Sequence, residues 1–246
     1  MHRQNGDVEM NGNSSDSEVE VIDPPSTEPT TGEGWKEKGT ESYKSKNYSE
    51  AVKSYTKALE VDPSLTAAQF NRAAAYMALR DYPSALQDCR EVLAAQKPRQ
   101  AKTLARMGKI QLALAQTQPA EYSLEEAKSL ADEATSKAVQ ADLAKLERLN
   151  NHLKSAQRER ERASWQMVTF ALDAAQREVE EVPMQWKIWR LEALIGRGKL
   201  DEAQFLATCV QPIYGRDLAD IACSDLVRAS QSNVCFTSAL AIISLR

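Results

Sequence analysis

The sequence has 246 residues, of which 42% are apolar and only nine are Gly and nine are Pro. A chain of this size can bury one large core or two modest ones, and the abundance of Ala, Leu, Glu, Lys, Arg and Gln after residue 32 predicts an all-α fold. The formal net charge is −4, and residues 1–32 alone carry −6, so the remainder offers no strong basic field for nucleic acid.

The first 32 residues are rich in Ser, Thr, Pro and acids and poor in aromatic residues, which predicts a disordered acidic tail. They contain neither the apolar core of a secretory signal nor the Arg-rich pattern of a transit peptide. The longest apolar run, residues 238–245, is far shorter than the roughly 20 residues of a membrane span. We therefore expect a monomer of the cytoplasm, with the nucleus as an alternative, that binds neither membrane nor nucleic acid.

Catalytic and metal chemistry have little support in the residue inventory. The chain has four Cys without CxxC spacing and two His, so we expect no metal site, disulfide framework or cofactor. The stretch GRGK at 196–199 lacks the strand and the Gly-x4-Gly-Lys-Ser/Thr spacing of a phosphate-binding loop. The sequence therefore predicts a protein that is not an enzyme.

Residues 33–63, 67–98 and 101–127 align with one another as three helix-turn-helix units. Small or matching apolar residues recur at intervals of 34 and then 35 residues, at Gly39, Ala73 and Gly108, at Ala51, Ala85 and Ala120, and at Tyr55, Cys89 and Leu124. A small residue at Gly39 and Ala51 is expected where the two helices of a hairpin cross closely.

This period, with Trp35, Gly39, Ala51, Tyr55 and Pro63 in the first unit, resembles the tetratricopeptide repeat, and implies a right-handed superhelix of antiparallel hairpins. Two departures are visible in the first unit. Lys38 stands where Leu is usual, and the aromatic residue comes one place late, at Tyr43.

The later copies are degenerate. Residues 132–163 contain no Gly or Pro and predict one long helix, residues 164–183 the second helix of a fourth repeat, and residues 184–210 a fifth hairpin. Residues 211–246 show neither the period nor the repeat signature, and either cap the solenoid or form a divergent C-terminus. The expected organisation is a tail over 1–32, three repeats over 33–131, a long helix and degenerate repeats over 132–210, and a divergent segment over 211–246.

Superhelices of this type present the first helix of each hairpin on a concave groove. Lys36 and Thr40 share a face of the first such helix, Asn71 lies on the second, and Lys102 and Arg106 share a face of the third. Their spacing predicts that these side chains converge on one site.

These repeats resemble the carboxylate-clamp domains of co-chaperones, which hold the C-terminal Glu-Glu-Val-Asp (EEVD) of heat-shock protein 70 and 90 class chaperones. In that family the first helix supplies Lys and Asn, the second Asn, and the third Lys and Arg. Here Lys36, Asn71, Lys102 and Arg106 match these positions, whereas Thr40 replaces the Asn of the first helix. The resemblance implies a co-chaperone adaptor that binds these chaperones. A shorter Thr side chain can still donate through its hydroxyl, so we expect a weaker or altered clamp.

Residues 34–210 also resemble the repeat region of DnaJ-type co-chaperones that carry a C-terminal J domain. The printed sequence contains no His-Pro-Asp, and Leu153 follows His152, so we expect docking to a chaperone without stimulation through a J domain. Two alternatives remain open: a scaffold that binds another peptide, and a repeat fragment of a larger J-domain protein.

Overall fold

The computed structural model describes residues 29–210, so the predictions for residues 1–28 and 211–246 lie outside the described residues. Helices are the only regular elements in the described range, which confirms the all-α fold. Their bounds are α1 Gly32–Lys44, α2 Tyr48–Val61, α3 Thr66–Ala78, α4 Tyr82–Ala95, α5 Ala101–Ala113, α6 Thr117–Leu130, α7 Glu133–Glu161, α8 Trp165–Gln176, α9 Met184–Gly196 and α10 Leu200–Val210. No helix within these residues combines the length and the apolar character that crossing a membrane requires.

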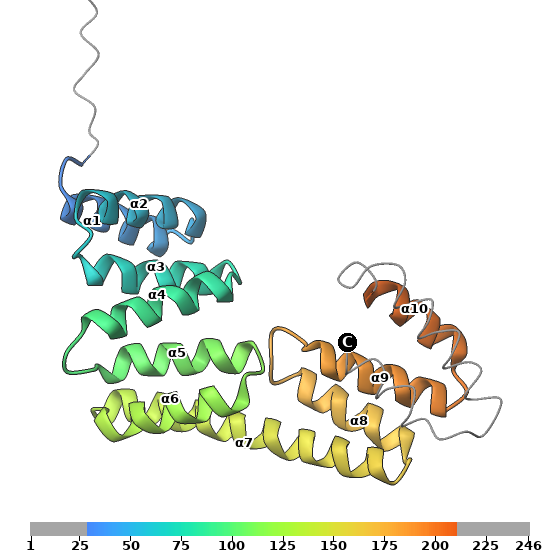
Figure 1. Cartoon of the computed structure of the whole chain (residues 1–246). Helices are drawn as coiled ribbons and strands as arrows, with labels where there is room; N and C mark the ends of the chain where they lie inside the picture. Colours follow the sequence, from blue (N-terminus) through green and yellow to red (C-terminus); the bar gives the residue numbers. More distant parts are fainter. Residues whose placement is uncertain (1–28, 211–246) are drawn as a thin grey trace, which may run out of the picture.

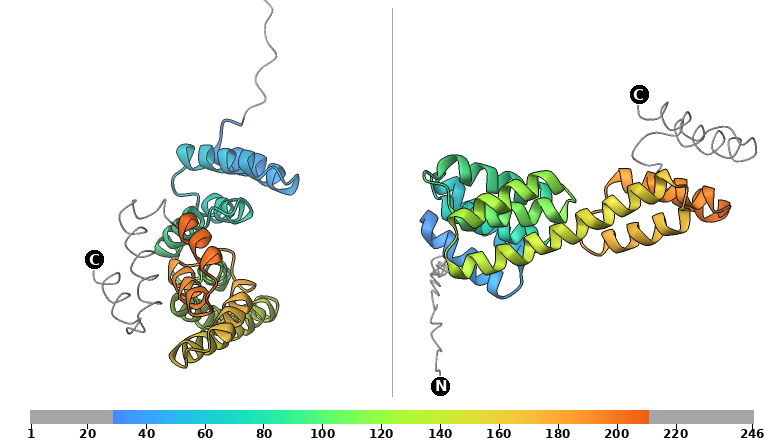
Figure 2. Two further views of the ribbon diagram at one scale, coloured as in Figure 1. Left: turned by 90° about the vertical axis from the view of Figure 1, so that its right-hand side faces the viewer. Right: turned by 90° about the horizontal axis from the view of Figure 1, so that it is seen from below.

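The helices pair as antiparallel hairpins that stack into a superhelix (Figure 1). Helices α1 to α6 form one block of three hairpins, and α7 runs beneath α6 and onward to carry α8, α9 and α10 (Figures 1 and 2). With 29 residues, α7 is about 43 Å long, which is why it can serve both blocks.

One turn geometry closes all five hairpins within residues 29–210. A residue with positive φ follows the first helix of each, with φ values of 62°, 62°, 56°, 53° and 73° at Lys46, Arg80, Ala115, Ala163 and Gly198. This left-handed conformation lets the turn's N–H groups bond the last carbonyls of the helix, as when Lys46 donates to the Tyr43 carbonyl at 2.9 Å. The turn residue therefore gives a common register for the five hairpins.

The small residues stand where the sequence predicts close helix crossings. A Cβ added to Gly39 would lie 2.7 Å from the Tyr55 ring, and one added to Gly108 would lie 2.6 Å from Leu124. Tyr55 and Leu124 are fully buried by these contacts and by the neighbouring hairpins. The repeat signature thus reflects how closely the two helices of a hairpin approach.

The register of the turns extends the repeat into the degenerate region. Ala156 precedes Ala163 by the seven residues that separate Gly39 from Lys46. Ala156 is fully buried, and the residues at the corresponding positions of the earlier hairpins, Gly39, Ala73 and Gly108, are buried as well. The first helix of the fourth hairpin therefore crosses its partner at the same point of the repeat.

An insertion separates the third hairpin from the fourth. The turns at Arg80 and Ala115 are 115 − 80 = 35 residues apart, which is the repeat length. The turns at Ala115 and Ala163 are 163 − 115 = 48 residues apart, or 13 more than that length. The additional residues lie in α7, which extends the first helix of the fourth hairpin.

The loop between α8 and α9 ties the second block back onto the first. The backbone N–H groups of Glu180 and Glu181 both donate to the Ala113 carbonyl at the end of α5, each at 3.0 Å. Arg80 forms an ion pair with Glu180 at 3.0 Å, and the Val179 side chain is buried beside the same core. These contacts fix the fourth and fifth hairpins against the repeats that carry the predicted site.

Candidate peptide-binding site

The five predicted site residues lie on the first helices of three successive hairpins. Lys36 and Thr40 are on α1, Asn71 is on α3, and Lys102 and Arg106 are on α5. Helix α3 packs on α1 and α2 of the first hairpin and on α4 of its own hairpin, and α4 packs on α5 of the third. The structure therefore places the five residues on adjacent helices of one stack.

Arg106 reaches from the third hairpin toward the first two. Its guanidinium lies 3.5 Å from the centroid of the Phe70 ring, and its Nη1 donates to the Phe70 carbonyl. Burial lowers the pKa of Arg106, and the nearby Cys89, Tyr43 and Tyr55 partly offset this effect. Arg106 has no carboxylate partner within residues 29–210, so the site contains a half-buried cation without a matching anion.

Lys36 is tethered within its own helix. Its Nζ forms an ion pair with the Glu33 carboxylate one turn earlier, and the Lys36 side chain is 24% exposed. Glu33 is far more exposed, at 60%. An exposed ion pair of this kind is worth at most about 1 kcal/mol, so an incoming carboxylate can take the place of Glu33 at little cost.

Thr40 uses its hydroxyl inside the protein. Its Oγ1 donates to the Lys36 carbonyl at 2.9 Å and lies 3.2 Å from the Tyr55 hydroxyl. Because a hydroxyl carries one proton, the Tyr55 hydroxyl is the donor in the second contact. Thr40 therefore has no proton left for a ligand in this conformation, and the expected hydroxyl donor is already occupied.

Asn71 and Lys102 are the least constrained of the five. Asn71 is half-buried and its side chain makes no hydrogen bond to another described residue. Lys102 is exposed and forms no ion pair in the described part of the chain. Hydrogen bonds from Thr135 lower the pKa of Asp132, with a smaller contribution from the charge of Lys102. Both side chains are thus able to turn toward a ligand.

Lys38 has a different environment from Lys36. Its Nζ lies 4.7 Å from the centroid of the buried Trp35 ring, and the Lys57 Nζ lies 4.2 Å from the same centroid. Cations at such distances are attracted by the negative face of the indole. The lysine that replaces the usual Leu therefore packs on the tryptophan that anchors the first hairpin.

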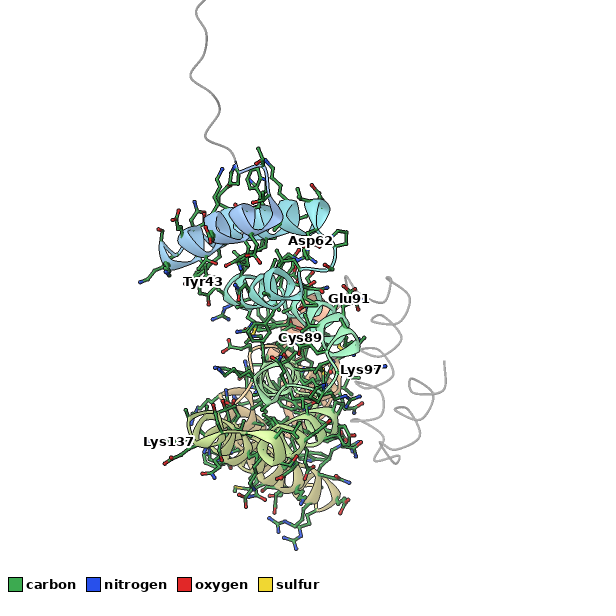
Figure 3. All side chains as sticks on the ribbon, turned by 90° about the vertical axis from the view of Figure 1, so that its left-hand side faces the viewer. Tyr43, Asp62, Cys89, Glu91, Lys97 and Lys137 are labelled. Carbon is green, nitrogen blue, oxygen red and sulfur yellow. The ribbon has the colours of Figure 1, made fainter. Side chains whose placement is uncertain are left out.

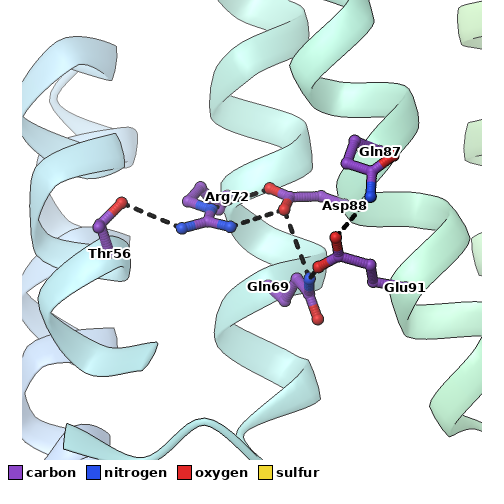
Figure 4. Close-up of polar contacts among 6 residues, drawn as sticks. All are labelled: Thr56, Gln69, Arg72, Gln87, Asp88 and Glu91. Atoms are coloured by element: carbon purple, nitrogen blue, oxygen red, sulfur yellow. Dashed lines mark hydrogen bonds and ion pairs between the residues drawn. The ribbon is translucent and has the colours of Figure 1, made fainter. Parts of the chain in front are cut away.

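Sequence reasoning missed the polar network that holds α3 in place. Arg72, next to Asn71, bonds both carboxylate oxygens of Asp88, with Nε–Oδ2 at 2.9 Å and Nη2–Oδ1 at 2.7 Å, and its Nη1 donates to Thr56 at 3.2 Å (Figure 4). The hydrogen bond to Asp88 raises the pKa of Arg72 against the effect of burial. The available signal was Asp88 itself, a carboxylate directly before the buried repeat position of Cys89.

Cys89 lies inside the stack, while Tyr43 and Asp62 lie toward opposite sides of it (Figure 3). Burial raises the pKa of the Cys89 thiol to about 12, although Arg106 acts in the opposite direction. The thiol is therefore protonated at neutral pH and is a core residue.

An open cavity of about 520 Å³ lies between α6 and α7, and none of the five predicted residues lines it. Within residues 29–210, no group of three or more His, Cys, Asp or Glu side chains is placed to hold a metal ion.

Comparison with known proteins supports the repeat assignment. The family model described as TPR repeat matches residues 39–79. DnaJ homolog subfamily C member 7 from Mus musculus is 31% identical over 178 residues, which are 72% of this chain and 35% of that protein. The chain spans about a third or less of the length of the curated relatives it matches.

One solved structure shares the architecture of most of this chain. The crystal structure of the P58(IPK) TPR domain superposes with a TM-score of 0.68 at 19% identity, covering 82% of this chain and 56% of that one. The first TPR of Spaghetti (RPAP3) bound to HSP90 peptide SRMEEVD has a TM-score of 0.45 at 28% identity, covering 49% of this chain and 93% of that one. Residues 39–79 therefore match the tetratricopeptide repeat, and the repeat period and the stacked hairpins continue the same architecture through the described residues.

Proposed function

We propose that this chain is a co-chaperone adaptor whose first three hairpins bind the C-terminal EEVD peptide of heat-shock protein 70 or 90 class chaperones. Lys102 and Arg106 supply two of the cations, Lys36 supplies the third, and Asn71 supplies an amide donor. A chain that ends in Asp offers two carboxylates close together, which such a set of donors can hold. The sequence resemblance to clamp domains suggests the ligand, and the geometry of the site supports it.

The observation that carries the proposal is the state of Arg106. It is half-buried, its pKa is lowered by burial, and it has no anionic partner among the described residues. Leaving a cation in such a place is unfavourable unless a bound anion compensates it. A hydrogen bond from a charged donor to a carboxylate contributes about 1.5–3 kcal/mol, so a few of them support an affinity near micromolar, or about −8 kcal/mol.

Calorimetric titration with two synthetic peptides ending in Glu-Glu-Val-Asp tests the proposal, one with a free C-terminal carboxylate and one amidated. We expect the free acid to bind and the amide to bind at least tenfold more weakly. Lys102→Ala and Arg106→Ala should each weaken binding of the free acid about tenfold or more, because each removes a charged donor. Lys53→Ala is the matched control, since Lys53 is 69% exposed on α2 and pairs with Glu50.

Unchanged affinity in both Lys102→Ala and Arg106→Ala would refute the clamp. Equal affinity for the free acid and the amide would instead support a scaffold that holds another part of a peptide. The two results are separable because the first changes the protein and the second changes only the terminal group of the ligand.

A further inference from the structure

We propose that Phe70 is the positioning residue for Arg106, holding its guanidinium in the orientation that receives the terminal carboxylate. This inference rests on the proposed function and adds a residue that the five-residue clamp does not contain. Phe70 is on α3 and Arg106 is on α5, so the contact joins the second hairpin to the third.

The distance identifies the contact as a stacked one. The Arg106 Cζ is 3.5 Å from the centroid of the Phe70 ring, which is the closest separation that two planar groups adopt in face contact. The negative face of the ring attracts the cation, and the planar guanidinium suits such stacking better than an ammonium group would.

A second contact from the same residue fixes rotation within the plane. The Arg106 Nη1 donates to the Phe70 carbonyl, which uses one of the five N–H groups of the guanidinium. The ring covers one face of the guanidinium, and the carbonyl holds one edge. The remaining donors are therefore confined to the other edges of a plane whose orientation Phe70 sets.

Among the described residues, Phe70 is the one that holds the Arg106 guanidinium by a hydrogen bond. Tyr43, Tyr55 and Cys89 are close enough to influence its charge, but none of them forms a hydrogen bond with it. Without the ring, the long Arg side chain would sample several rotamers and lose that freedom on binding. A guanidinium already fixed before the ligand arrives avoids this loss, which is the benefit of preorganisation.

Phe70 lies directly before Asn71, another residue of the proposed site. Phe70 and Asn71 are consecutive on α3. A shift of the backbone at Phe70 would therefore move both the Asn71 amide and the Arg106 guanidinium. Phe70 is half-buried, which leaves the ring available to stack while the backbone stays in the helix.

Two substitutions separate the aromatic face from simple bulk. Phe70→Leu keeps an apolar side chain but removes the planar face, and Phe70→Tyr keeps the face. With the free-acid peptide ending in Glu-Glu-Val-Asp, we expect Phe70→Leu to weaken binding about five- to tenfold and Phe70→Tyr to stay within twofold of the unaltered protein. Tyr122→Leu, which removes an exposed aromatic side chain on α6, is the control and should leave the affinity for the peptide unchanged.

A double-mutant cycle shows whether Phe70 acts through Arg106. In the Arg106→Ala background, Phe70→Leu should cause no further loss. A loss of the same size in both backgrounds would overturn the positioning role, because Phe70 would then act on the ligand or the fold independently of Arg106.

Nuclear magnetic resonance of the unliganded protein gives a readout that needs no ligand. The ring current of Phe70 should shift the Arg106 side-chain protons upfield in the unaltered protein and in Phe70→Tyr. Absence of this shift in the unaltered protein would overturn the proposal even if Phe70→Leu fails to fold.

The outcomes distinguish the two proposals. If the unaltered protein does not bind the peptide, the proposed function fails and the positioning role fails with it. If it binds and Phe70→Leu binds equally well, only the positioning role is overturned.

Discussion

Arg72 and Asp88 form a two-point ion pair between α3 and α4, with the Asp88 side chain only 3% exposed and that of Arg72 18% exposed. The pair sits one residue away from Asn71 and one from Cys89, and it continues through Thr56 into the first hairpin. It therefore fixes the helix that carries Asn71.

Removing the charge of Asp88 should destabilise the protein strongly. Breaking a buried ion pair leaves its partner uncompensated, so we expect Asp88→Asn to lower the free energy of unfolding by about 3 kcal/mol. Urea unfolding followed by circular dichroism measures it. Glu50→Gln breaks the exposed Lys53–Glu50 pair, at 3.4 Å, and should cost less than about 0.5 kcal/mol. Equal losses in the two variants would contradict a special role for the buried pair.

Adding a single methyl group at Gly39 should also be destabilising. Ala is the better helix former, but its Cβ would lie 2.7 Å from the Tyr55 ring, which is too close without a shift of the two helices. We expect Gly39→Ala to cost about 1–3 kcal/mol through overpacking. Glu41→Ala on the exposed side of α1 should change stability by less than about 0.5 kcal/mol. A gain in stability for Gly39→Ala would show that the hairpin can open without penalty.

At the turn residue Lys46, a substitution should increase stability. Lys46 is exposed and has φ of 62°, a conformation that costs an L-residue roughly 1 kcal/mol and Gly almost nothing. Lys46→Gly should therefore raise the melting temperature. Ser45→Gly next to it should lower that temperature, since Ser45 has φ of −77° and gains nothing from Gly.

Thr40 should be the position where the clamp can be improved. Its hydroxyl proton is donated to the Lys36 carbonyl, so Thr40→Ala should weaken binding of the free-acid peptide by less than twofold. Thr40→Asn adds amide donors and should strengthen it several-fold. Calorimetry on the two variants checks both. A tenfold loss in Thr40→Ala would show that the hydroxyl turns to the ligand in the complex.

Cys89 should be unreactive in the native protein. Burial raises the pKa of its thiol to about 12, so the reactive thiolate is scarce at neutral pH, and iodoacetamide should label Cys89 only after unfolding in urea. The labelled peptide can be identified by mass spectrometry.

The same pKa shift sets a pH dependence. Between the ordinary thiol range near pH 9 and the native value near 12, the unfolded chain loses the Cys89 proton while the native protein keeps it. The free energy of unfolding should therefore fall as pH rises through this window. Cys89→Ala should remove that part of the decline.

Much of the fold follows directly from the sequence. The spacing of Gly39, Ala73 and Gly108 predicts the hairpins because only a small residue fits where the two helices cross, and that requirement is local. The degenerate fourth repeat was harder to define, since Val168 stands where the earlier repeats have Ala. The turn residues show the register of the fourth repeat. Their positive φ could not be predicted from the sequence, because it occurs here at ordinary residues such as lysine and alanine.

For the candidate site, the sequence predicts which residues share a helix face, and the tertiary structure decides their contacts. Helical periodicity alone assigns Lys102 and Arg106 to one face of α5, because residues four apart lie above each other on a helix. It says nothing of what each side chain touches. The donation from Thr40 to the Lys36 carbonyl, the pairing of Arg72 with Asp88 and the stacking of Arg106 on Phe70 are contacts that only the folded chain shows. The last two depend on the packing of one helix on the next, because they join residues that the sequence leaves far apart.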